Sequence, residues 1–107
     1  MPMINIKFDD KVISDEKIAE LSSALMQIVQ EATGIPEVFA YADSPRIKIN
    51  VAPVEVFIEM SISKVPDKNI LFDTIKTKLL GWKKTSGFSC PITITLTPVD
   101  WKFEVGI

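Results

Sequence analysis

The chain has 107 residues, 47% of them hydrophobic and 24% charged, with a net charge of -2, one cysteine and no histidine. This length suits a single domain, residues 1–107. No apolar run approaches the roughly 18 residues of a membrane-spanning helix. The weakly acidic net charge does not indicate a basic surface that would bind nucleic acid. Without histidine the usual zinc and iron ligand sets are missing, so we expect no metal and no cofactor. The charge and the lack of a long apolar run lead us to expect no nucleic-acid partner and no membrane partner. Because no signal segment is visible, we expect a cytoplasmic location.

The N-terminal segment reads as a strand. Ile4, Ile6 and Phe8 alternate with polar residues, the period-two pattern of a half-buried strand, so Pro2 is its first residue. Two interpretations of Pro2 compete. Proline is tolerated at the start of a strand, where its missing N–H costs no ladder bond. If Met1 is removed, Pro2 instead carries a free secondary amine, which can act as a base.

Residues 15–33 predict an amphipathic helix. Ser14 is a candidate N-cap, and Gly34 is a candidate left-handed terminator. Apolar residues at helical spacing form one stripe: Ile18, Leu21, Leu25, Ile28, Val29 and Ala32.

Three short segments between this helix and the next read as strands. Residues 38–42 form the first, ended by a turn at residues 43–45. Residues 47–51 alternate again and predict a hairpin arm or an extension of the sheet. Residues 54–62 give the strongest strand, because every even-numbered residue in that segment is apolar.

The second half ends in a helix and alternating segments. Pro66 and Asp67 open the helix, and Gly81 is expected to end it. Residues 91–97 predict a strand, and the alternation continues over residues 99–105, so we expect a structured tail with a final short strand.

The predicted order is strand, helix, strand, used twice. Right-handed crossovers place both helices on one face of a four-stranded mixed sheet, an α+β fold of two βαβ units. Phe39, Tyr41 and Phe57 indicate large apolar groups on the other face as well. One chain has no elements left to cover that face, so we expect oligomerisation.

Four stretches in this order resemble the tautomerase superfamily, which includes 4-oxalocrotonate tautomerase and macrophage migration inhibitory factor. They are Met1-Pro2 leading into a strand, EATGIPEVF (31–39), MSISKV (60–65), and a helix followed by PITITLT (91–97). The resemblance covers nearly the whole chain. It implies a homotrimer whose processed N-terminal proline, Pro2, lies in a pocket between subunits and acts as a general base.

The resemblance also implies groups that bind the substrate, a small carbonyl acid. Lys64 matches a lysine after the third strand, and Arg46 lies near a turn where some relatives hold a carboxylate with arginine. The backbone amides of Ile62 and Ser63 match a turn close to the proline. The chain departs from the macrophage factor at Ile35, where that relative has lysine. For Arg46 and Lys64 the alternative is solvated surface charge.

Two functions follow from this pattern. The leading hypothesis is a small tautomerase or isomerase that uses Pro2 as its base. The alternative is a non-catalytic trimeric scaffold or binding protein. The missing lysine at Ile35 favours the alternative, and so does retention of Met1, because the Pro2 nitrogen is then an amide without basicity.

Overall fold

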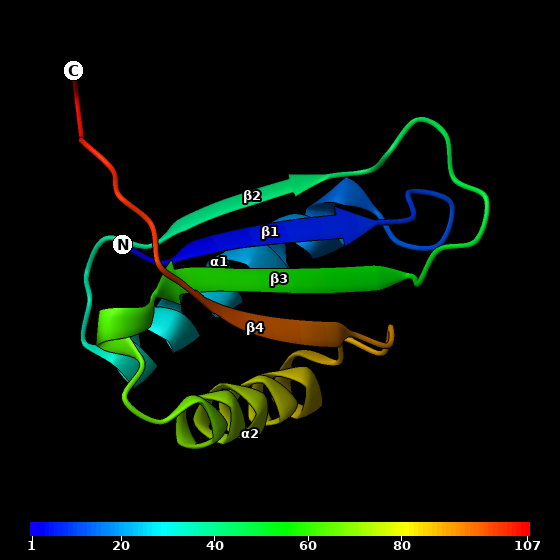
Figure 1. Cartoon of the computed structure of the whole chain (residues 1–107). Helices are drawn as coiled ribbons and strands as arrows, with labels where there is room; N and C mark the ends of the chain where they lie inside the picture. Colours follow the sequence, from blue (N-terminus) through cyan, green and yellow to red (C-terminus); the bar gives the residue numbers. More distant parts are fainter.

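The computed structural model describes all residues, 1–107, and contains four strands, two α-helices and one 3-10 turn (Figure 1). The elements are β1 (Met3–Phe8), α1 (Asp15–Thr33), β2 (Phe39–Asp43), β3 (Val54–Ser61), η1 (Ile62–Lys64), α2 (Lys68–Ser86) and β4 (Thr93–Val99).

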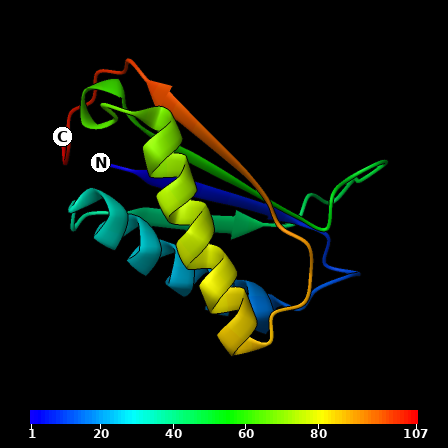
Figure 2. The ribbon, with the colours of Figure 1, turned by 90° about the horizontal axis from the view of Figure 1, so that it is seen from below.

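The four strands form one mixed sheet in the order β2-β1-β3-β4. β1 pairs in parallel with β2, β3 pairs in parallel with β4, and the central pair β1 and β3 is antiparallel. Both helices lie on the same face of the sheet (Figure 2). The predicted α+β fold of two βαβ units is therefore confirmed.

The first helix has the predicted bounds, 15–33, because both of its ends are capped. The Ser14 hydroxyl accepts a hydrogen bond from the Lys17 N–H at 3.3 Å. Gly34 adopts a left-handed φ of 71°, and its N–H donates to the Gln30 carbonyl at 2.8 Å.

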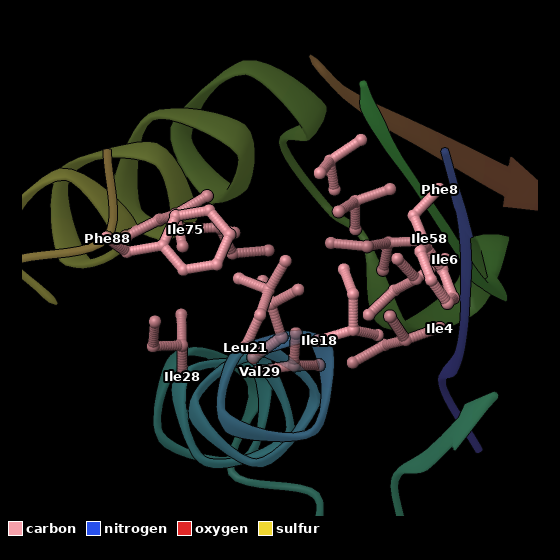
Figure 3. Packing of buried hydrophobic residues seen from close by; sticks show 14 of the residues in the cluster. Ile4, Ile6, Phe8, Ile18, Leu21, Ile28, Val29, Ile58, Ile75 and Phe88 are labelled. Carbon is pink, nitrogen blue, oxygen red and sulfur yellow. The ribbon is translucent and has the colours of Figure 1, made fainter. Parts of the chain in front are cut away.

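The core lies between the sheet and the helices. A cluster of 16 buried residues fills this layer, and its sheet side is formed by the even-numbered residues of β1 and by three residues of β3: Val54, Val56 and Ile58 (Figure 3). Ile4, Ile6 and Ile58 are completely buried, and no polar or charged residue is buried anywhere in the chain. Burial of a side chain of this size contributes about 1.5–3 kcal/mol, so this layer is the main source of stability.

The opposite face of the sheet carries no other element (Figure 2). The strand register places Tyr41, Asn5 and Phe57 in one row across this open face. Tyr41 remains 54% exposed, and Phe39, in the next row, remains 41% exposed. The prediction that both faces carry large apolar groups is confirmed.

The predicted end of the second helix at Gly81 is wrong. Helix α2 continues through Gly81 to Ser86, and Gly87, with φ 74°, is the cap whose N–H donates to the Lys83 carbonyl at 3.1 Å. Beyond Gly81, the ring of Trp82 contacts that of the buried Phe88, with centroids 5.3 Å apart. This packing offsets the roughly 1 kcal/mol that a glycine costs inside a helix.

The predicted strand at residues 47–51 is also wrong, because this segment is part of the loop between β2 and β3. The alternating residues of this segment pair with no strand. Lys48 instead fastens the loop, since its ammonium donates to the Pro45 carbonyl at 2.8 Å and to an Asp10 carboxylate oxygen at 3.1 Å. Ile49 next to it is 96% exposed.

The tail after Val99 does not continue as a strand. Val99 pairs with Ser61, the last residue of β3, and the chain then turns away in η1, so residues 100–107 find no further partner. The tail crosses the end of the sheet, and the two termini lie at that same end (Figures 1 and 2). The expected final short strand is therefore absent from the single chain.

Because α2 ends at Ser86, replacing Gly81 and Gly87 by alanine should change the free energy of unfolding in opposite directions. Gly81→Ala should raise the free energy of unfolding by about 1 kcal/mol, because an added Cβ there meets nothing within 4 Å. Gly87→Ala should lower the free energy of unfolding by about 1 kcal/mol, because alanine is strained at positive φ. Urea denaturation measures both, and destabilisation by Gly81→Ala would place the helix end at Gly81 after all.

Candidate functional site

Pro2, predicted to be the first residue of the strand, directly precedes β1, which begins at Met3, and is buried, with less than 2% of its surface exposed. Its carbonyl accepts a hydrogen bond from the Phe39 N–H at 3.1 Å. The strand register places it between Val38 on one side and Met60 on the other, and these are 7% and 0% exposed. The nitrogen of Pro2 therefore lies at the edge of an apolar environment, and in the full chain it is bonded to Met1.

The end of β3 lies beside Pro2, because β3 runs antiparallel to β1. Turn η1 follows directly, so three predicted site residues, Ile62, Ser63 and Lys64, lie at the same end of the sheet as Pro2. The hydroxyls of Ser61 and Ser63 are 2.9 Å apart. Ile62 is 57% exposed, so within one chain its side chain does not wall the proline.

Lys64 is exposed and faces the gap between the helices. It lines a hollow of about 440 Å³ between the end of α1 and the start of α2, together with Thr33 and Asp67. No carboxylate lies within ion-pairing distance of its ammonium. A cation without a counterion is available to an anionic ligand.

Arg46 lies at the other end of the molecule from Pro2. It follows β2, and β2 is parallel to β1, so its loop extends from the far end of both strands. β1 alone spans about 17 Å at roughly 3.3 Å per residue. Within one chain the structure therefore does not bring Arg46 and Pro2 together. Arg46 is exposed and forms no ion pair.

Trp101 is a polar group at this end that the sequence pattern did not single out. Because Val99 pairs with Ser61, Trp101 comes two residues beyond the last paired position, at the end of the sheet that holds Pro2. Its indole Nε1 is buried without a hydrogen-bond partner. Phe103 contacts it edge-on, with centroids 6.1 Å apart. A buried donor without an acceptor costs about 1–3 kcal/mol, which an incoming acceptor would recover.

Ile35 occupies the position where the resemblance leads us to look for a lysine. It is half-buried in the turn after α1, where its N–H donates to the Thr33 hydroxyl at 3.2 Å. No cation is contributed from this turn.

No group of three or more His, Cys, Asp or Glu side chains is placed to hold a metal ion. Neither helix has both the length and the apolar character that crossing a membrane requires.

Neither a protein-family model nor a curated protein sequence matches the chain. Solved structures do. A Leishmania major MIF2 structure is 19% identical, with a TM-score of 0.65, over 99% of this chain and 95% of that one. Malonate semialdehyde decarboxylase is 14% identical, with a TM-score of 0.66, over 98% and 92%, and its study included a variant with alanine replacing proline at its first residue.

A fused 4-OT, solved as an asymmetric trimer, is 12% identical, with a TM-score of 0.68, over 94% of this chain and 91% of that one. All three likenesses span nearly the whole length of both chains. At these identities they establish the arrangement of the elements. The chain has the fold of the tautomerase superfamily.

Proposed function

We propose that the chain is a small cytoplasmic tautomerase or isomerase in which Pro2, freed by removal of Met1, is the general base acting on a small carbonyl acid. The observation that carries this proposal is the burial of Pro2 directly before β1, with less than 2% of its surface exposed. The shared fold supports the proposal.

Burial would make the Pro2 amine a usable base. A free α-amine has a pKa of about 8 and is mostly protonated at neutral pH. An apolar environment disfavours the charged form and lowers this pKa. Each unit of lowering corresponds to about 1.4 kcal/mol between the protonation states. The amine would then accept protons near neutral pH.

The reaction moves one proton. The Pro2 nitrogen takes a proton from a carbon next to a carbonyl, the electrons of that C–H bond form the C=C bond of an enolate, and the proton returns at another atom. Negative charge develops on the enolate oxygen and needs donors. The donors at this end are the Lys64 ammonium, the Trp101 indole N–H and the backbone amides of Ile62 and Ser63.

The pocket would be completed between subunits of a homotrimer. The open sheet face exposes Tyr41 and Phe39, and large apolar groups on an uncovered face favour association. Arg46 lies too far from Pro2 in its own chain, so it would hold a substrate carboxylate only from a neighbouring subunit.

The second candidate function is a trimeric scaffold or binding protein without catalysis. One observation favours it: Ile35 places an apolar side chain where the macrophage factor carries a lysine. Under this alternative Pro2 is buried only as part of the core.

The trimer prediction concerns solution mass. Light scattering should give three times 11.9 kDa. Tyr41→Glu should reduce the mass to that of one chain, because it places a charge on the open face that another subunit would bury. Gln27→Glu, on the exposed surface of α1, is the matched control and should leave the trimer intact. A wild-type chain that stays monomeric would contradict both the trimer and the shared pocket.

The base prediction uses one chain in two forms. With a cleavable N-terminal extension, the Pro2 nitrogen is an amide and ketonisation of phenylenolpyruvate should proceed at the uncatalysed rate. Cleavage that leaves Pro2 first should start turnover, and kcat/KM should rise with pH along a limb below about 8, because the base must be deprotonated. Pro2→Ala keeps a primary amine and should retain part of the rate.

Intact mass establishes processing of the natural N-terminus, since loss of one methionine residue must accompany activity. Labelling of Pro2 by a 3-halopropiolate reagent gives a second readout that needs no turnover. Processed protein that neither turns over nor becomes labelled would show that the proline only begins the strand, and would leave the scaffold as the function.

The cation prediction compares three lysine and arginine variants. Lys64→Ala and Arg46→Ala should each reduce kcat/KM by about tenfold or more, the usual effect of losing a charged hydrogen bond. Lys68→Ala, another exposed cation at the start of α2, is the control and should change nothing. All three should unfold within about 0.5 kcal/mol of wild type. Unchanged kcat/KM in the Lys64→Ala and Arg46→Ala variants would show that both residues are only solvated surface charges.

A further inference from the structure

An apolar hollow of about 240 Å³ lies between α2 and the edge strand β4, away from Pro2. Its apolar lining comes from the helix and from the start of the strand: Phe72, Leu79, Leu80, Ile92 and Ile94. β4 is parallel to β3, so its start lies at the end of the sheet opposite to Pro2. The hollow and the candidate catalytic site are therefore separate.

The hollow exists because β4 is the last strand of the sheet. Ile94 of β4 and Ile92, just before the strand, lie on the helix face with no strand beyond them and remain half-buried. On the helix, Leu79 is 3% exposed and forms the floor, whereas Leu80 is 57% exposed and forms part of the wall. Apolar surface is thus left open to solvent in a concave place.

Two lysines complete the lining, Lys76 and Lys83. They are seven residues apart on α2 and so lie on one face of the helix, two turns apart. The Lys83 ammonium donates to the Cys90 carbonyl at 3.0 Å, which fixes it beside the chain that enters β4. Neither lysine has a carboxylate within ion-pairing distance, and no acidic residue lines the hollow.

This combination selects one class of ligand. An apolar floor with a few convergent polar groups is the usual character of a small-molecule site. Two unpaired cations attract an anion, and a carboxylate can accept hydrogen bonds from an ammonium. A volume of about 240 Å³ lies below the roughly 300–1,000 Å³ of most small-molecule pockets, so the ligand must be small.

We propose that this hollow binds a small amphipathic carboxylate, with its aryl or short alkyl group on Leu79, Ile92 and Ile94 and its carboxylate at Lys76 and Lys83. The inference does not depend on the proposed function, because neither lysine takes part in it. Phenylacetate is a suitable probe, and phenylacetamide is its neutral match.

The test uses the full-length chain with an added N-terminal extension that is not cleaved. The Pro2 nitrogen then stays an amide, so a carboxylate cannot pair with a free Pro2 amine. Amide resonances are followed by ¹H–¹⁵N NMR while phenylacetate is added. Saturable shifts are expected at Leu80, Ile92 and Ile94, and phenylacetamide should bind at least about tenfold more weakly. Lys83→Gln and Lys76→Gln should each weaken phenylacetate binding about tenfold.

Lys78→Gln is the matched control, because this lysine lies on the same helix but pairs with Glu31 at 3.3 Å, outside the hollow. It should leave the affinity unchanged. If phenylacetamide binds as tightly as phenylacetate, the proposal is wrong. The aliphatic parts of Lys76 and Lys83 then only cover apolar surface. Shifts confined to the Pro2 end, or a hollow closed to the probe by a second copy of the chain, would overturn it as well.

Discussion

The antiparallel pairing of β1 with β3 is the constraint on which the rest of the structure depends. Its register, from Met3 opposite Glu59 to Phe8 opposite Val54, turns the even-numbered side chains of both strands toward the helices and completes the core. The same register places the start of β1 beside the end of β3. The burial of Pro2 and the position of η1 at the same end of the sheet are therefore consequences of the pairing that stabilises the fold.

The elements with a unique local pattern could be predicted from the sequence. Residues 15–33 carry both caps and a full apolar stripe, and β3 alternates without interruption. The prediction failed where the local sequence pattern did not agree with the contacts that the segment makes in the folded chain. Residues 47–51 alternate like a strand, but no strand pairs with them, although the outer edge of β2 is free. Gly81 resembles a terminator, but the helix continues past it, where Trp82 packs against Phe88.

The candidate site was predictable in part. Pro2 and the turn η1 that contains Lys64 lie at the same end of the sheet, because the antiparallel pairing brings the start of β1 to the end of β3. Arg46 was grouped with them by resemblance, yet the parallel pairing of β2 with β1 sends it to the far end. Trp101 could not be identified from its type or spacing. Its significance is a buried, unpartnered indole nitrogen, which only coordinates reveal.

The central claim is that the enclosure of Pro2 makes its nitrogen a base. The most direct measurement is the pH titration of that nitrogen by NMR, in chain labelled with ¹⁵N-proline and processed so that Pro2 is first. We expect a single titration with a pKa below the ordinary value of about 8 for a free α-amine, because the apolar surroundings disfavour the charged form. A pKa at or above that ordinary value would contradict it.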